Sequence, residues 1–215
     1  MDDLFGEHDD GSGLLVKSLD SATACKMVVE HHYLHREPPI CWAYGLWDGG
    51  NLRGVVTFGF PASREMQKSA CPTDPASVLE LNRLWVDDRM PRNSESWFVS
   101  RALSKLPPAI VVSYADTAQG HAGYIYRALN FHYAGWTDMD RKTPRWDYPS
   151  NGKHSRDAFR GGRTLLDIDP IRVPRSPKVR YWIAAGPDRR VRAQMASRCA
   201  WPSKSWKAEP PPTAT

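Results

Sequence analysis

Runs of hydrophobic positions separated by turn residues predict that the chain begins with a helix and a β-hairpin. Residues 40–47 and 52–60 are two apolar runs, and the Asp-Gly-Gly-Asn sequence at 48–51 is a strong hairpin signal. Before them, apolar positions recur at helical spacing over residues 22–33, and Ser21 supplies an oxygen that can cap this helix. One helix followed by two antiparallel strands is therefore expected.

Strand and helix patterns alternate through the rest of the chain, after a proline-containing loop at 61–77. A helix begins at Ser94, and the prolines after Leu106 end it. The same patterns predict strands at 78–86, 109–114, 131–136 and 179–184, a helix at 95–106, a short helix that ends at Leu129 and another helix near 189–197.

This order of elements predicts an α+β fold. Antiparallel hairpins come first and βαβ units follow, which favours a mixed, largely antiparallel central sheet flanked by helices. Around it, residues 1–13 form an acidic, glycine-rich tail that we expect to be disordered. The main domain would span residues 14–184 and include a long basic loop at 137–177, and residues 185–215 would form a basic, proline-rich extension.

Charge is distributed unevenly along the chain. Residues 1–140 carry 12 Lys and Arg against 18 Asp and Glu, whereas residues 141–215 carry 17 against 6, so the net charge of +5 comes from the C-terminal third. Aromatic residues are interleaved with the basic ones there. Cations bind phosphates without regard to sequence, and flat rings stack on exposed bases, so this third favours nucleic-acid binding. The alternative is a solvated basic face with ordinary core aromatics.

The cysteines and the apolar runs indicate a cellular compartment. Four cysteines are scattered without a C-x-x-C pair, which argues against a zinc ribbon or a disulfide framework and favours a reducing cytoplasm. The acidic N-terminus is unlike a secretory signal, and no apolar run reaches the length of a membrane span. We therefore expect a cytoplasmic protein without a membrane partner.

The most informative stretch is residues 114–131. An apolar run ends at Asp116, a glycine-rich corner follows, and a short helical pattern carries Tyr126. A strand that ends at an acid and turns into a helix brings both side chains to one rim of the sheet, where ligands bind in open sheets with such crossovers. This rim is the predicted site.

Two other clusters carry candidate chemistry. His31 and His35 would share a face of a continuous helix and could bind a metal, although cations also simply stabilise helix C-termini. In a strand, Arg83 would share a face with Leu81 and Trp85, where a guanidinium needs an anion. That anion could be Asp116, another acid or a substrate phosphate, and an ordinary structural ion pair is the alternative.

The helix start at Asn93, Ser94 and Ser96 is a candidate cofactor site, because free N–H groups there can hold a pyrophosphate. The ending Tyr-Arg-Ala-Leu-Asn-Phe at 126–131 resembles the last crossover helix of GNAT-type acyltransferases, in which the tyrosine serves as an acid near the thioester sulfur. Those enzymes hold coenzyme A at this helix start through a glycine-rich loop. Here glycine is absent and Glu95 repels anions, and both features count against acetyl-CoA, the cofactor that this resemblance implies.

Taken together, several segments are similar to the Mom family of bacteriophage DNA-modification proteins. They are His-His-Tyr-Leu-His at 31–35, Leu-Asn-Arg-Leu-Trp-Val-Asp-Asp at 81–88, the helix that starts at Ser94 and Ser-Tyr-Ala-Asp at 113–116. The resemblance implies a GNAT-like fold, a link to iron and conversion of adenine N6 in DNA to a carbamoylmethyl amine, which shields phage DNA from restriction. The catalytic residues that it implies are His32, Tyr33, Arg83, Ser100, Asp116 and Tyr126.

Chemistry supports the link to iron. A carbamoylmethyl group joins N6 through a CH₂ carbon, and a methyl carbon of acetyl-CoA becomes reactive there only after oxidation, for which a redox metal is suited. Among the implied residues, imidazole, phenol and carboxylate donors suit iron, and Arg83 would hold an anionic substrate group. The candidate iron ligands are His32, Tyr33, Asp116 and Tyr126.

Stacking hides adenine N6 in duplex DNA, so the base must be flipped out or met in a single strand. The basic segments would hold the DNA backbone, and Trp146 or Tyr148 could stack on the base. Two alternatives remain open: an ordinary N-acetyltransferase of a protein or small amine, and a non-catalytic DNA-binding protein. The candidate DNA contacts are Arg141, Lys142, Arg145, Trp146, Tyr148, Lys153, Arg156, Arg160, Arg163 and Arg180.

Overall fold

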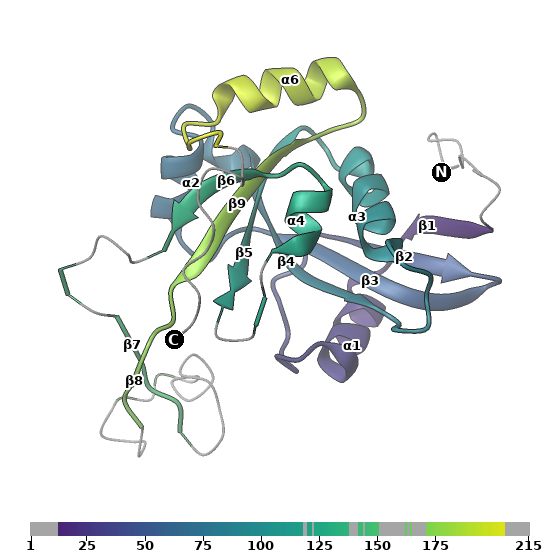
Figure 1. The fold of residues 1–215 in the computed structure, drawn as a ribbon, viewed down its shortest axis with the longest axis horizontal. Coiled ribbons are helices and arrows are strands. Elements are labelled where there is room, and N and C mark those ends of the chain that lie inside the picture. Colours follow the sequence, from purple (N-terminus) through teal and green to yellow (C-terminus); the bar gives the residue numbers. More distant parts are fainter. Residues whose placement is uncertain are drawn as a thin grey trace.

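A seven-stranded sheet forms the centre of the computed structural model (Figure 1). The structure describes residues 13–117, 120–121, 123–137, 142–143, 145–150, 162, 164 and 171–204. The strand order is β1-β2-β3-β4-β5-β9-β6, and only β4 and β5 run parallel. The strands are β1 (Leu14–Ser18), β2 (Trp42–Asp48), β3 (Asn51–Gly59), β4 (Val78–Val86), β5 (Ala109–Asp116), β6 (His132–Trp136) and β9 (Lys178–Ala185).

Helices cover both faces of this sheet (Figure 1). Alternation of side chains along β5 shows how: Val111 packs in one cluster with Phe98 of α3, whereas Ile110 and Val112 pack in another with Met195 of α6. The described helices are α1 (Ser21–His31), α2 (Arg64–Ala70), the 3-10 turn η1 (Pro75–Ser77), α3 (Ser94–Lys105), α4 (Tyr124–Ala128) and α6 (Arg189–Arg198). This architecture confirms the predicted α+β class with a mixed, largely antiparallel sheet.

Several predicted elements are confirmed, and others need correction. The hairpin turn falls at Gly49 and Gly50, both with positive φ, and β4 has the predicted bounds. By contrast, β1 was not predicted, and the predicted loop at 61–77 contains α2, whose first turn is capped by the Ser63 side chain. The cap of α1 is the Asp20 carboxylate, which accepts from Thr23 N at 2.9 Å, and not Ser21.

The predicted long basic loop at 137–177 also contains regular structure. A two-stranded sheet pairs β7 (Trp146–Asp147) with β8 (Val173–Pro174). The acidic tail at 1–12 and the end of the chain from residue 205 lie outside the described residues. None of the helices in the described ranges combines the length and the apolar character needed to cross a membrane.

The feature that positions the site is the separation of β4 from β5. Their parallel ladder runs only from Val78↔Ile110 to Glu80↔Val112, although β4 continues to Val86 and β5 to Asp116. At the same place β4 has a β-bulge against β3. Thr57 and Phe58 are consecutive in β3, but they pair with Arg83 and Leu81, so the register skips Asn82. Two strands that part at the centre of a sheet leave polar backbone and side chains facing an opening, and the pocket described next lies there.

Candidate active site where strands β4 and β5 separate

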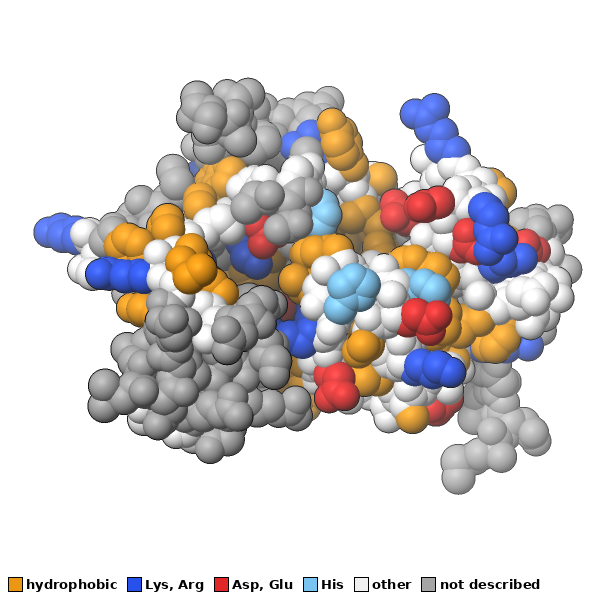
Figure 2. All heavy atoms as spheres, turned by 90° about the horizontal axis from the view of Figure 1, so that it is seen from below, with side chains coloured by type: hydrophobic (Ala, Val, Ile, Leu, Met, Phe, Trp, Pro, Cys, Tyr) orange, Lys and Arg blue, Asp and Glu red, His pale blue; other side chains and the backbone are white. Residues whose placement is uncertain are grey.

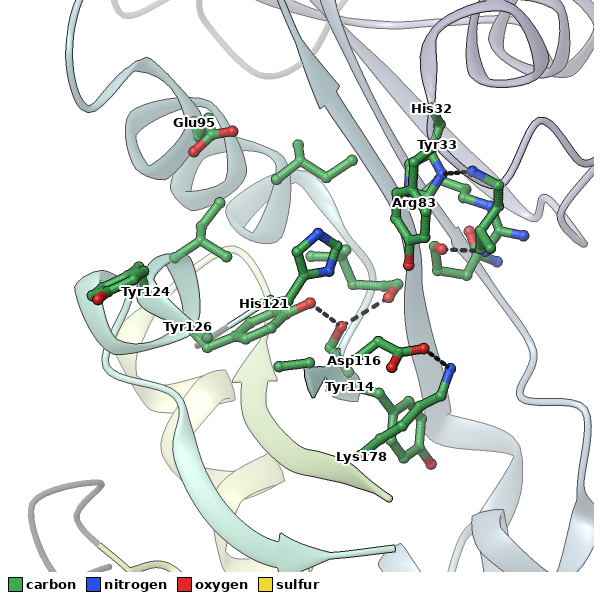
Figure 3. Close-up of a pocket in the computed structure, with 18 of the residues that line it drawn as sticks. His32, Tyr33, Arg83, Glu95, Tyr114, Asp116, His121, Tyr124, Tyr126 and Lys178 are labelled. Atoms are coloured by element: carbon green, nitrogen blue, oxygen red, sulfur yellow. Dashed lines mark hydrogen bonds and ion pairs between the residues drawn. The ribbon is translucent and has the colours of Figure 1, made fainter. Parts of the chain in front are cut away.

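One pocket of about 420 Å³ lies in the opening between β4 and β5. A volume of this size is typical of small-ligand sites. Figure 2 shows that histidine side chains lie among hydrophobic, acidic and basic ones on the face seen from below Figure 1. Close up, the lining comes from the segment after α1, the parted ends of β4 and β5, the first turn of α3, the corner before α4, α4 itself and the first residue of β9 (Figure 3).

The end of helix α1 brings His32 and Tyr33 to this pocket. His32 is the C-cap, and its extended backbone turns the chain away from the helix axis. Its Nδ1 accepts a hydrogen bond from the Leu34 backbone N–H at 3.2 Å. Burial, with smaller effects of Arg83 and His121, lowers the pKa of His32 to about 4, so the imidazole is neutral near pH 7.

Because α1 ends at His31, the proposed metal pair on its last turn does not form. The His31 ring stacks on Trp85 with centroids 4.2 Å apart and an angle of 14°. The Nδ1 atom of His35 lies 2.9 Å from the Val29 carbonyl oxygen, and His35 has a φ of 43°. The prediction that His31 and His35 share a helix face was therefore wrong.

Asp116 reaches the pocket from the last position of β5, which extends two residues beyond the predicted strand at 109–114. Its Oδ2 lies 2.8 Å from Lys178 Nζ, and its Oδ1 accepts from Ser176 Oγ at 3.1 Å. Burial raises the pKa of the Tyr33 phenol first, Asp116 raises it further, and Arg83 opposes them. The carboxylate, the phenol and the guanidinium thus act on one another across the pocket (Figure 3).

Tyr126 enters from α4 on the other side of the pocket (Figure 3). Its hydroxyl is 2.8 Å from Ser113 Oγ, and its ring stacks on Tyr181 with centroids 4.8 Å apart. Burial raises the pKa of Tyr126 to about 12, against an opposing effect of the hydrogen bond with Ser113. The phenol is therefore protonated near neutral pH and can act as an acid.

Five of the six predicted catalytic residues line this one pocket: His32, Tyr33, Arg83, Asp116 and Tyr126. The sixth, Ser100, is exposed on α3 and is not part of the lining. No geometry of the pocket connects it to the other five. Its catalytic role stays a prediction.

The predicted cofactor residues at the start of α3 also lie outside the lining, to which only Glu95 of this segment contributes. The Ser94 hydroxyl donates to the Pro91 carbonyl at 2.7 Å, and the Ser96 hydroxyl donates to the Asn93 carbonyl at 3.0 Å. Asn93 itself has a φ of 71°. Both serine protons are thus used locally, and cofactor binding by these residues stays a prediction.

The predicted iron ligands have suitable donor atoms, but most of them already have protein partners. His32 Nδ1 accepts from Leu34, the Asp116 carboxylate pairs with Lys178, and Tyr126 bonds to Ser113. Within the described ranges, no three His, Cys, Asp or Glu side chains gather into a metal-binding group. As arranged, the four side chains do not fit iron, because an ion would have to displace these partners. The iron prediction is therefore not supported, and no catalytic step below depends on it.

Three pocket residues were missed from the sequence. His121 is exposed in the glycine-rich corner, and its ring lies edge-on to Tyr33 with centroids 5.1 Å apart. Ser113 stood inside a recognised motif, but nothing in the pattern marked its contact with Tyr126. Lys178 is opposite Asp116 only because β9 inserts between β5 and β6, which no local signal predicts.

None of the predicted DNA contacts that fall within the described ranges lines the pocket. Lys142 and Arg145 are exposed, and Tyr148 is half-buried. The Arg172 guanidinium lies over the Trp146 ring at 3.9 Å. Arg180 lies in β9 with its guanidinium 5.2 Å from the Trp201 ring. The other predicted contacts, which lie outside the described residues, are Arg141, Lys153, Arg156, Arg160 and Arg163.

Comparison with known proteins adds relatives and distant structural neighbours. The chain is 34% identical over 129 residues to the methylcarbamoylase mom of Escherichia phage Mu, a match that covers 57% of this chain and 54% of that protein. It therefore spans about half the length of this curated relative.

Among solved structures, a putative acetyltransferase of Salmonella typhimurium with acetyl-CoA has a TM-score of 0.44 and 10% identity, covering 82% of this chain and 95% of that one. An N-acetyltransferase from Staphylococcus aureus has a TM-score of 0.44 and 11% identity, covering 80% and 99%. These likenesses are distant, and the function proposed below does not depend on them.

The similarity in sequence to one protein family extends over most of the chain. Residues 13–167 match the Mom protein family. This match includes the segment after α1, β4, β5 and α4, which together supply all of the predicted catalytic residues that meet in the pocket. This chain is a member of the Mom protein family.

Proposed function

We propose that this protein is a DNA-modifying transferase that converts adenine N6 to N6-carbamoylmethyladenine and so protects phage DNA from restriction. The observation that carries the proposal is that His32, Tyr33, Arg83, Asp116 and Tyr126, distant in sequence, line one pocket. Membership of the Mom family and similarity to a relative named methylcarbamoylase support it.

Asp116 and Tyr126 have complementary tasks in this proposal. Adenine N6 is conjugated with its ring and is a weak nucleophile, so it needs a base as it bonds to the CH₂ carbon. The Asp116 carboxylate, paired with Lys178, accepts the proton that N6 loses. Tyr126 stays protonated near pH 7 and supplies a proton to the atom that separates from the carbon donor.

Arg83 and the neutral His32 complete the polar lining. The Arg83 guanidinium holds an anionic group of the carbon donor, since planar N–H donors match carboxylate and phosphate oxygens. His32 accepts at Nδ1, so its proton resides on Nε2, and the ring serves as a hydrogen-bond donor. Acetyl-CoA as the carbon donor stays a prediction, and the roles assigned here to Asp116, Tyr126, Arg83 and His32 require only a donor whose CH₂ carbon carries a leaving group.

The target base reaches the pocket by leaving the DNA stack. Tyr33 is 43% exposed and His121 is exposed as well, and both rings belong to the pocket lining. The earlier candidates for stacking, Trp146 and Tyr148, lie outside it. We therefore assign base stacking to the Tyr33 ring, beside which His121 closes one side of the pocket.

The DNA backbone is held by the β7–β8 arm, which we define as residues 145–150 and 171–175. It lies on the lower left in Figure 1, and the chain passes from it into β9 at Lys178, inside the pocket. The exposed Arg145 and the Arg172 guanidinium over Trp146 offer cations to phosphates. The arm thus carries positive charge next to the site of chemistry.

The test is to express the protein in bacteria, digest the DNA to nucleosides and analyse them by mass spectrometry. The expected result is a heavier adenosine that carries the carbamoylmethyl increment, and its loss with Asp116→Asn. Asp74→Asn is the matched control, because Asp74 forms an ion pair with Arg198, at 3.6 Å, outside both the pocket lining and the β7–β8 arm. Unmodified DNA from folded protein would refute the proposal, and an acetyl increment would support the N-acetyltransferase alternative.

A further inference from the structure

We propose that Ser113 is a positioning residue that orients the Tyr126 hydroxyl and stabilises the phenolate that remains when Tyr126 gives up its proton. The catalytic part of this inference rests on the proposed function, whereas the contact between the two side chains is part of the structure.

Ser113 lies at the point where the sheet opens. The ladder between β4 and β5 ends at the pair Glu80↔Val112, and Ser113 and Leu81 are the next residues of the two strands. The Ser113 hydroxyl is 2.9 Å from the Leu81 carbonyl oxygen. A side chain therefore satisfies the first carbonyl of β4 beyond the ladder, and this holds Ser113 Oγ in a fixed place.

The number of protons fixes the direction of the two hydrogen bonds. A carbonyl oxygen can only accept, and a serine hydroxyl has a single proton. Ser113 therefore donates to Leu81 O, and Tyr126 donates its own proton to Ser113 Oγ over 2.8 Å. Ser113 is only 1% exposed, so water does not compete for these bonds. In the resting site the phenol is held in one orientation.

Loss of the Tyr126 proton changes this arrangement. The phenolate becomes the stronger acceptor, and the Ser113 hydroxyl turns from the Leu81 carbonyl to donate to it. Burial has the largest effect on the Tyr126 phenol and raises its pKa, the hydrogen bond that Ser113 donates to the phenolate lowers it, and Tyr33, Tyr181 and Glu80 raise it by smaller amounts. The balance of protons is simple, because the proton that leaves Tyr126 goes to the reacting group and the serine keeps its own.

This inference can be tested without measuring the reaction. Tyr126 is replaced by a difluorotyrosine, whose phenol titrates near neutral pH, and its ionisation is followed by fluorine NMR. Ser113→Ala should raise the pKa of this phenol by about one unit, which makes it about ten times weaker as an acid. Ser113→Cys, which keeps the side-chain size but donates more weakly, should raise it by a smaller amount. Ser104→Ala removes a serine of α3 outside the pocket lining and should leave it unchanged.

The outcomes separate this inference from the proposed function. A phenol that titrates alike in the wild type, Ser113→Ala and Ser113→Cys would overturn the inference even where DNA is modified. Should Ser113→Ala fail to fold, the Ser113→Cys titration decides alone. If Ser113→Ala raises the pKa of the phenol but the protein leaves DNA unmodified, the result would support the contact between Ser113 and Tyr126 and count against the proposed function. Where DNA is modified, Ser113→Ala should slow the reaction roughly tenfold, and Ser104→Ala should not.

Discussion

Lys178 stands directly opposite Asp116 in the pairing of β5 with β9, and its ammonium nitrogen lies 2.8 Å from the Asp116 carboxylate. The two residues form the last pair of the ladder that joins β5 to β9. Only 16% of the Asp116 side chain is exposed, so the cation sits against a carboxylate with restricted access to water. This places Lys178 in the catalytic machinery that we propose.

Lys178→Met should therefore slow DNA modification by about tenfold or more while the fold is kept. Methionine retains the length of the side chain but removes the charge-assisted bond to Asp116, whose orientation is then less restricted. The rate is measured as modified adenosine formed per unit time at equal protein concentration. Lys68→Met is the matched control, because Lys68 forms an exposed pair with Glu65 at 3.4 Å. Equal rates of DNA modification for Lys178→Met and Lys68→Met would show that Lys178 has no part in the reaction.

Two glycines in the corner before α4 allow the packing beneath Tyr126 to be tested. Gly120 and Gly123 both have a φ of +69°. A Cβ at Gly120 would meet nothing within 4 Å, whereas a Cβ at Gly123 would lie 2.4 Å from the Tyr181 hydroxyl oxygen. Tyr181 in turn stacks on Tyr126. The same backbone strain is thus present at both positions, and the clash only at Gly123.

Gly120→Ala should cost about 1 kcal/mol of unfolding free energy, and Gly123→Ala a further 1–3 kcal/mol, roughly, because the clash is added to the strain. Denaturant unfolding monitored by circular dichroism measures both. We expect Gly123→Ala also to lower the modification rate, since the Tyr181 ring that supports Tyr126 must move. Equal unfolding free energies of the two variants would contradict the expected clash between a Cβ at position 123 and Tyr181.

The elements that depend on local pattern could be predicted, and those that depend on the partner strand could not. The turn at Gly49 follows from a local turn sequence, and the strand before Asp116 follows from an apolar run that ends at this residue. Short β1 was missed because five residues beside a polar tail carry little periodicity. Insertion of β9 between β5 and β6 is a long-range choice, which is why the place of Lys178 was not foreseen.

In the candidate site, too, some residues could be predicted from the sequence, whereas contacts that depend on the arrangement of the strands could not. Resemblance supplied residues such as His32 and Tyr126, and the structure brings them to one pocket. The proposed metal pair of His31 and His35 failed because α1 ends one turn too early for them to share a face. The contact between Ser113 and Tyr126 depends on where β4 and β5 part, and sequence patterns carry no information on that point.

The low pKa of His32 predicts a pH dependence of stability. Its folded pKa, about 4, is below the ordinary value of 6.5, so between these values the unfolded chain binds a proton that the folded protein does not. This contribution is absent above pH 6.5, and stability is lost as the pH falls toward 4. It amounts to about 2 kcal/mol once solvent screening is allowed for.

His32→Gln should therefore flatten the fall in unfolding free energy between pH 6.5 and 4, because glutamine does not titrate there. Denaturant unfolding at a series of pH values gives the comparison. NMR titration of the His32 ring checks the cause directly, and a ring that becomes protonated near pH 6.5 would contradict the prediction. In that case His32 would not be the neutral hydrogen-bond donor assigned to it.

The β7–β8 arm predicts how DNA binding depends on salt. Each phosphate contact releases condensed counterions, so removal of one cationic contact lowers the slope of log affinity against log salt by about 1. Arg145→Ala, at the start of the arm, should weaken binding to duplexes of different sequence equally and reduce this slope. Arg190→Ala is the control, because Arg190 is exposed on α6, which lies at the opposite end of the molecule in Figure 1. Fluorescence anisotropy over a range of salt concentrations measures both variants. If the slope of log affinity against log salt falls with Arg190→Ala and not with Arg145→Ala, the DNA does not bind the arm. The path by which the base enters the pocket would then have to be different from the one proposed here.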